Sequence, residues 1–116
     1  MVNQVIANQK TVSEYSLEGL RRLAGFGQVV LLYRRVQRHV EDLGYGLDDV
    51  CERLCELRES NFHHSENYDD DPRWHDVYVL PHPVAGNANE RLYIKFRVSR
   101  DCVYIEMCSF HPEGWQ

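Results

Sequence analysis

The sequence lacks any long apolar run and any recognisable secretory leader. Its apolar stretches, at residues 28–33 and 77–80, are strand-sized and far short of the ~20 residues that a membrane-spanning helix needs. The first ten residues, MVNQVIANQK, contain no basic segment followed by an apolar one, unlike a signal peptide. We therefore expect a cytoplasmic protein without a membrane partner, in which the four cysteines remain reduced thiols.

The spacings of the common metal sites are also missing. The chain has no HExxH and no CxxC motif. Cys51 and Cys55 are four residues apart, but on the apolar side of an expected helix, which indicates burial rather than zinc binding. The remaining candidate ligands are His63 and His64 with the acidic run at 69–71. We expect no metal and no cofactor, and a metal-dependent hydrolase built on these residues is the weakest alternative.

The chain has little of the positive charge that is typical of nucleic-acid-binding proteins. Its formal charge is −5, which argues mildly against such a function. The charge is segregated, however. Residues 41–76 hold twelve acids and three bases, a net of −9, whereas the other residues hold six acids and ten bases, a net of +4. A basic working face with an acidic flank therefore remains possible, because local potential steers a ligand more than the total does.

The apolar pattern predicts one domain over residues 1–116, with a polar, loosely ordered lead-in at 1–12. The expected elements are a helix at 14–24, a strand at 28–33, a helix at 34–43, a helix from 48 or 49, a loop at 60–73, and strands at 74–80, 91–99 and 102–110. A long loop joins the first two of these last strands, and a tight turn joins the last two, so both pairs should be antiparallel. The predicted class is α+β in the order α-β-α-α-β-β-β, with helices packed on one face of a small, mainly antiparallel sheet.

The expected strand at 91–99 carries a cationic face. Alternation places Leu92 and its apolar partners on one face and Tyr93, Lys95 and Arg97 on the other. Cations held on a rigid sheet suit a phosphodiester, because they bind the phosphate and stabilise the charge that develops during cleavage. An ordinary solvated face with surface charges is the plainer interpretation of this strand alone.

Three histidines gather where the acidic loop meets the strand at 74–80. They are His63, His64 and His75. A lone histidine is more often structural than catalytic, but two histidines beside a basic strand can serve as base and acid near neutral pH. Metal-free RNA cleavage needs that pairing, because a base removes the 2′-hydroxyl proton and an acid protonates the leaving 5′-oxygen.

Several short runs stand out in order along the chain: Gly27-Gln28-Val29, Asp42-Leu43-Gly44 with Leu47-Asp48 and Cys51, Glu59-Ser60-Asn61-Phe62 with Ser65, Trp74-His75-Asp76-Val77-Tyr78, and Leu92-Tyr93-Ile94-Lys95. The same runs appear in the same order, and at nearly the same spacing, in MqsR-type toxins, which the chain resembles over roughly residues 15–111. These toxins cleave mRNA in bacterial toxin–antitoxin systems and have a RelE-like α+β fold. The resemblance implies a metal-independent endoribonuclease acting on single-stranded mRNA, free or on the ribosome. It also implies a cognate antitoxin protein as partner.

The resemblance further implies a catalytic set. The family's two lysines fall on His64 and His111, its glutamine on His75 and its tyrosine on Tyr93. Three of these four positions are histidine here, so we expect the same cleavage by proton carriers that titrate nearer neutral pH than lysine does, with His64 and His75 as the acid–base pair in either order.

Other residues are expected to hold the RNA. Lys95 and Arg97 would bind the scissile phosphate, together with Tyr93. Trp74, Tyr78 or Tyr93 would stack on unpaired bases.

The position of His111 depends on the backbone of the last strand. Strict alternation puts His111 on the core side, whereas a β-bulge would return it to the working face. Without a bulge, Tyr104 or Glu106 would face the site instead. The alternative function is a non-catalytic homologue that binds an antitoxin or another protein, and the acidic loop favours it.

Overall fold

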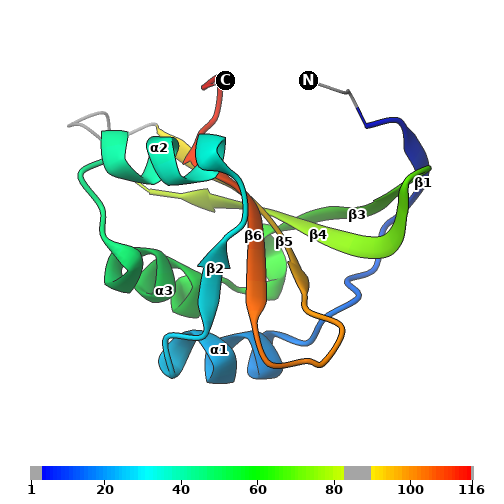
Figure 1. Cartoon of the computed structure of the whole chain (residues 1–116), viewed down its shortest axis with the longest axis horizontal. Coiled ribbons are helices and arrows are strands. Elements are labelled where there is room, and N and C mark those ends of the chain that lie inside the picture. Colours follow the sequence, from blue (N-terminus) through cyan, green and yellow to red (C-terminus); the bar gives the residue numbers. More distant parts are fainter. Residues whose placement is uncertain (1–3, 83–89, 116) are drawn as a thin grey trace.

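In the computed structural model, the described part of the chain forms one sheet of six strands, in the order β1-β3-β4-β5-β6-β2 (Figure 1). The structure describes residues 4–82 and 90–115. Its elements are β1 (Ile6–Lys10), α1 (Leu17–Gly25), β2 (Val29–Leu31), α2 (Arg34–Asp42), α3 (Leu47–Glu56), the 3-10 helix η1 (Glu59–Asn61), β3 (Phe62–Tyr68), β4 (Asp71–Pro81), β5 (Arg91–Val98) and β6 (Ile105–Pro112). Neighbouring strands are antiparallel except for β2 and β6, which are parallel. The predicted α+β class with a mainly antiparallel sheet is confirmed.

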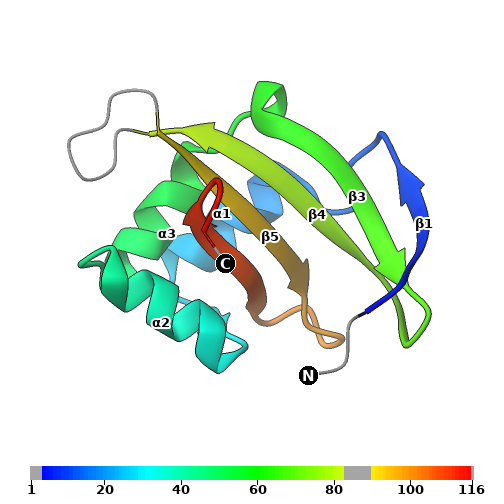
Figure 2. The same cartoon turned by 90° about the horizontal axis from the view of Figure 1, so that it is seen from above.

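The helices form where amphipathic stripes predicted them. In α1, Ser16 accepts a hydrogen bond from the backbone N–H of Gly19 at 3.0 Å and so caps the first turn. Apolar residues of all three helices join the apolar face of β4, β5 and β6 in one core, with Val36, Leu54 and Phe96 fully buried. Helices α1 and α3 pack against each other on that side of the sheet, and α2 packs along β6. Figure 2 shows β3, β4 and β5 from the opposite side, with no helix in front of them.

Two strands were missed by the sequence prediction. The expected lead-in contains β1, and the expected loop at 60–73 contains most of η1, all of β3 and the start of β4. Strand β1 is polar and mostly exposed, and among the described strands it pairs only with β3, at the edge of the sheet, so its sequence shows no apolar alternation. Strand β3 buries polar residues, including Ser65, Glu66 and Asn67, which hydrogen bonds satisfy. A prediction based on apolar periodicity cannot detect such strands.

The last hairpin also differs from the prediction. The loop covers residues 99–104 rather than 99–101, and β6 therefore begins three residues later than expected, at Ile105. The hydroxyl of Ser99 accepts hydrogen bonds from the backbone N–H groups of Val103 and Tyr104, which holds the wider turn together. The connection predicted at 81–90 includes residues 83–89, which lie outside the described residues, but the antiparallel pairing of β4 with β5 is confirmed. Within the described chain, none of the helices has both the length and the apolar character needed to cross a membrane.

Candidate active site

A polar surface covers the side of the sheet that α1 and α3 leave open. We call it the polar face, and its side chains come from β3, β4, β5 and β6. They are His64, Glu66, Tyr68, Asp71, Arg73, His75, Tyr93, Lys95, Arg97, Glu106 and His111. The strand register arranges them in rows. Lys95 and His64 lie in one row, on either side of Val77, while Tyr93 is paired with His111 in the next row.

A bulge in β6 brings His111 to the polar face. Phe96 pairs with Met107 and Lys95 pairs with Ser109, so Cys108 is an extra residue in β6. The carbonyl of Cys108 accepts a hydrogen bond from Arg35 of α2 at 3.2 Å. His111 then stacks on Tyr93, with 5.4 Å between ring centroids and 22° between ring planes. The bulge that the sequence analysis required for His111 is therefore present, and Glu106 occupies the same face as well.

The protonation of His111 and Tyr93 is set by burial. Burial lowers the pKa of His111, so its imidazole is neutral at neutral pH. The Nδ1 atom of His111 lies 2.7 Å from the carbonyl of Pro112 and therefore donates to it, which leaves Nε2 with a lone pair. Burial and the charge of Glu66 raise the pKa of Tyr93 to about 12. The pair thus consists of a neutral phenol and a neutral imidazole.

Lys95 occupies the middle of the polar face. Its Nζ atom donates a hydrogen bond to the Tyr68 hydroxyl at 2.7 Å and lies 3.6 Å from a carboxylate oxygen of Glu66. The side chain of Lys95 is only 17% exposed. Alternation within β5 predicted which face Lys95 occupies, but not its partners Tyr68 and Glu66, which come from another strand.

Arg97 is likewise held by carboxylates. Its Nε atom lies 2.6 Å from Glu106 and its Nη1 atom 2.5 Å from Asp71. Asp71 also pairs with Arg73, and although burial opposes it, hydrogen bonding by Arg73 and the charge of Arg97 lower the Asp71 pKa. Asp69 and Asp70 are exposed, whereas Asp71 is half-buried and begins β4 instead of belonging to the loop predicted at 60–73.

His75 is buried beneath this ion-pair network. The residue is 2% exposed, and its Nε2 atom lies 3.3 Å from Nη1 of Arg97, from which it accepts. Burial, followed by the charge of Arg97, lowers the pKa of His75. Its Nδ1 atom is buried and has no hydrogen-bond partner among the residues that the structure describes. His75 is therefore a neutral imidazole that contacts Arg97.

His64 forms a chain of hydrogen bonds with two neighbours on β3. Its Nε2 atom lies 2.5 Å from Glu66, and its Nδ1 atom lies 2.7 Å from Nδ1 of His63. Glu66 is only 5% exposed and also accepts a short hydrogen bond from Tyr68. Glu66 was not predicted, because a strand of polar residues offered no signal that this carboxylate would be buried.

The two other aromatic candidates lie off the polar face. Trp74 points to the opposite side of β4, where Nζ of Lys10 lies 4.3 Å from its ring centroid and its carbonyl accepts a hydrogen bond from Tyr15 at 2.7 Å. Tyr78 is 1% exposed and belongs to the core, so it cannot stack on RNA. Of the three aromatic residues suggested for stacking, only Tyr93 lies on the same face as the histidines.

The four predicted catalytic residues thus share one face without meeting at one point. Successive rows of the face are two residues apart along a strand, which is roughly 7 Å. His75 and Tyr93 are separated by the row that holds Lys95. The groups required by the metal alternative are also apart, since His63 and His64 begin β3 and the acidic run follows its end. Among the described residues no three His, Cys, Asp or Glu side chains gather as metal ligands would.

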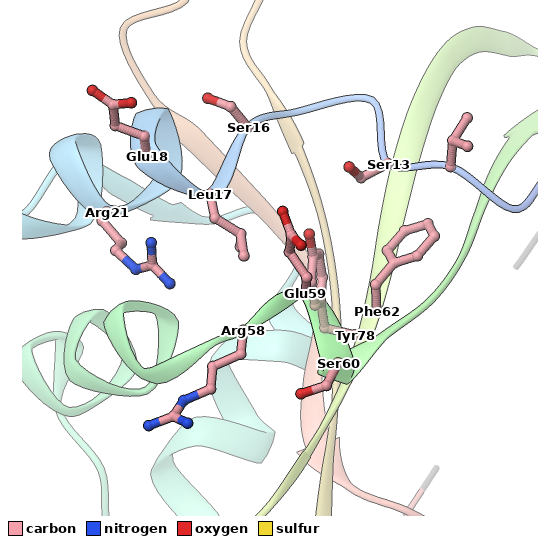
Figure 3. A pocket seen from close by; sticks show the side chains of 11 residues that line it. Ser13, Ser16, Leu17, Glu18, Arg21, Arg58, Glu59, Ser60, Phe62 and Tyr78 are labelled. Atoms are coloured by element: carbon pink, nitrogen blue, oxygen red, sulfur yellow. The ribbon is translucent and has the colours of Figure 1, made fainter.

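A pocket of about 1030 Å³ lies away from the polar face, between η1 and the segment that leads into α1 (Figure 3). Arg21 and Arg58 line it together with Glu18 and Glu59. Arg21 donates a hydrogen bond to the carbonyl of Leu57 at 2.7 Å. The pocket contains none of the histidines, and its cations and carboxylates balance.

Two comparisons relate the chain to known proteins. The family model described as "Motility quorum-sensing regulator, toxin of MqsA" matches residues 12–112. The mRNA interferase toxin MqsR of Escherichia coli (strain K12) is 30% identical over 98 residues, which is 84% of this chain and 94% of that protein. Strand β1 precedes the matched residues. The match covers nearly all of the sheet and every helix, and so the chain belongs to the MqsR toxin family.

Proposed function

We propose that this protein is a metal-independent endoribonuclease that cleaves mRNA, the toxin of a type II toxin–antitoxin pair. Family membership and the name of the E. coli relative support the reaction class. The observation that carries the proposal is the β6 bulge, which sets His111 against Tyr93 on the same open face as Lys95 and His64. Proton carriers thereby flank a central cation on a rigid sheet.

The proposed reaction is attack of the 2′-hydroxyl on the adjacent phosphorus, with departure of the 5′-oxygen. The catalytic set comprises His64, His75, Tyr93 and His111. His64 acts through its hydrogen bonds to His63 and Glu66. The open Nε2 atom of His111 accepts a hydrogen bond from the RNA, and the neutral phenol of Tyr93 donates one to the phosphate. His75 is buried against Arg97, which supports a role in orienting that guanidinium.

Lys95 and Arg97 bind the scissile phosphate in this proposal. Lys95 lies in the row between those of Tyr93 and Arg97, where an ammonium can neutralise charge on the pentacoordinate phosphorus. Trp74 contacts bases only if the RNA passes around β4 to its other side, since the ring lies off the polar face. The substrate is single-stranded mRNA, free or ribosome-bound, and the reaction takes place in the cytoplasm.

The decisive experiment incubates the purified protein with unstructured RNA in EDTA. We expect cleavage that leaves a 2′,3′-cyclic phosphate and a 5′-hydroxyl, with a loss of ~100-fold or more in a His111→Ala variant. Absence of cleavage in EDTA together with activity restored by a divalent ion would establish the metal-dependent alternative. An unaffected His111→Ala variant would remove this histidine from the catalytic set.

A non-catalytic homologue is the second candidate, and the ion pairs favour it. The three cations Arg73, Lys95 and Arg97 all lie against the carboxylates Glu66, Asp71 or Glu106, so the face is largely neutralised from within. RNA binding without cleavage, or binding to an antitoxin alone, would establish this function. An open reading frame next to this gene that encodes a protein able to form a stable complex with this chain would identify the proposed antitoxin.

A further inference from the structure

A second bulge turns His63 toward His64. Successive side chains of a regular strand point to opposite faces of the sheet. The rings of His63 and His64 instead lie 4.9 Å apart, with 2.7 Å between their Nδ1 atoms. Phe62 pairs with Tyr78 and His64 pairs with Val77, so His63 is an extra residue in β3. Bulges re-aim side chains in this way and are common beside active sites.

Glu66 determines which nitrogen of His64 carries a proton. Burial alone would raise the pKa of the Glu66 carboxyl, but hydrogen bonds from Tyr68 and His64 and the charge of Lys95 outweigh burial and lower it. The ionised carboxylate can only accept, so the Nε2 atom of His64, 2.5 Å away, must donate. In the neutral imidazole, Nδ1 of His64 then has the lone pair.

The same logic extends to His63. A nitrogen–nitrogen distance of 2.7 Å requires one donor and one acceptor, and Nδ1 of His64 is the acceptor. Nδ1 of His63 therefore carries its proton, and the lone pair of His63 is on Nε2. His63 is exposed, and Nε2 has no hydrogen-bond partner in the part of the chain that the structure describes. The chain of hydrogen bonds thus ends in an open proton acceptor.

We propose that Nε2 of His63 is the general base that takes the 2′-hydroxyl proton, with His64 and Glu66 as positioning residues behind it. This inference rests on the proposed ribonuclease function. As the bond from O2′ to phosphorus forms, the hydroxyl proton moves to Nε2 of His63, and the Nδ1 proton of His63 moves to Nδ1 of His64. The positive charge settles on His64, beside the Glu66 carboxylate. The bond from phosphorus to the 5′-oxygen breaks, and that oxygen takes a proton from the Lys95 ammonium, which lies in the same row of the face as His64.

Activity measurements test whether His63 takes part in cleavage. Cleavage of unstructured RNA in EDTA should fall ~100-fold or more in His63→Ala, because a positioned base contributes that much. His82→Ala is the matched control, since His82 contacts Tyr45 and lies outside the polar face. His63 is exposed, so the variant should melt like the wild type. A His63→Ala variant that cleaves as fast as the control overturns the inference and leaves the proposed function intact.

The tautomers of His63 and His64 provide a second test, because a purely structural role of His63 would not require these particular tautomers. Nitrogen-15 spectra of the imidazoles should show the Nε2–H form of His64 and the Nδ1–H form of His63 in the wild type. Glu66→Gln should mix the His64 forms and lower cleavage, because a neutral amide can donate as well as accept. A predominant Nε2–H form of His63 would overturn the relay even in an active enzyme. A wild type that cleaves no RNA would instead remove the proposed function, and the base with it.

Discussion

Most charged residues of the polar face form ion pairs with a neighbour of opposite charge. Arg97 lies between Asp71 and Glu106, and Lys95 lies near Glu66. An RNA phosphate that approaches these cations competes with carboxylates that already hold them. The affinity for RNA should therefore depend on how firmly each acid holds its base. Glu106 is the most exposed of the three acids, with 21% of its side chain accessible.

We expect Glu106→Gln to bind RNA more tightly than the wild type. The substitution frees one side of Arg97 and removes a negative charge from the face, which should be worth ~1 kcal/mol, or roughly fivefold in Kd. Fluorescence anisotropy with a 2′-O-methylated RNA, which cannot be cleaved, measures this directly. Glu113→Gln is the control, because it makes the same charge change at the pair that Glu113 forms with Arg91. Equal affinities of the two variants would show that Glu106 does not restrain Arg97.

Strand β1 is an edge element outside the apolar core. Within the described chain it contributes no residue to that core, and it pairs with β3 alone. Its residues precede the segment shared with the family. Nevertheless β1 covers the edge of β3, which would otherwise expose unpaired backbone groups beside the His63–His64 pair. Exposed strand edges invite pairing with other chains.

Removal of residues 1–11 should leave a folded protein that tends to self-associate. The core and all helices remain, so melting should stay cooperative, with a Tm lower by ~5 °C or more from the lost strand pairing. Circular dichroism and light scattering after size-exclusion chromatography measure both effects. A truncated chain that fails to fold would show that β1 is essential to the sheet. A strictly monomeric truncated chain would show that the β3 edge is protected by other means.

The stability of the whole molecule should depend on pH, because buried histidines bind protons less readily in the native state than in the unfolded chain. Burial lowers the pKa of both His75 and His111 below the ordinary value of 6.5. The unfolded chain then binds more protons than the native chain at mildly acidic pH, so stability is lost as pH falls from about 6.5 through the native values. The pKa values of the Glu66 and Asp71 carboxyls are also lowered in the native state. Protonation of these carboxyls reduces stability only when the pH falls below their ordinary pKa values of 4.5 and 3.8.

The Tm should accordingly fall between about pH 7 and pH 5, before the carboxylates are protonated. His75→Gln should show a smaller fall, because the amide accepts from Arg97 but cannot become charged. Thermal melting of both proteins over this pH range tests the sign and the assignment. An identical fall in the two proteins would exclude His75 as a contributor, and a rise in Tm toward acid would contradict the burial argument as a whole.

The sequence predicted those parts of the structure that a pattern of apolar residues marks, and it did not predict the others. Helices and the strands β4 and β5 were predicted because an apolar stripe marks which side is buried. Strands β1 and β3 were missed because one is exposed and the other buries hydrogen-bonded polar groups. The shared face of Tyr93, Lys95 and Arg97 followed from alternation within one strand. Their carboxylate partners could not be found this way, since they come from β3, β4 and β6 and depend on register.

The bulge in β6 has a consequence for how such a site changes over evolutionary time. The bulge accommodates one additional residue, Cys108, so Ser109 and His111 keep the outward positions that a regular strand without Cys108 would give them, and Phe110 still reaches the core. A single-codon insertion or deletion at this bulge can therefore change the length of the strand without changing the side chains offered to a substrate. Homologues that differ by one residue in length at this point would still present the same side chains on the polar face.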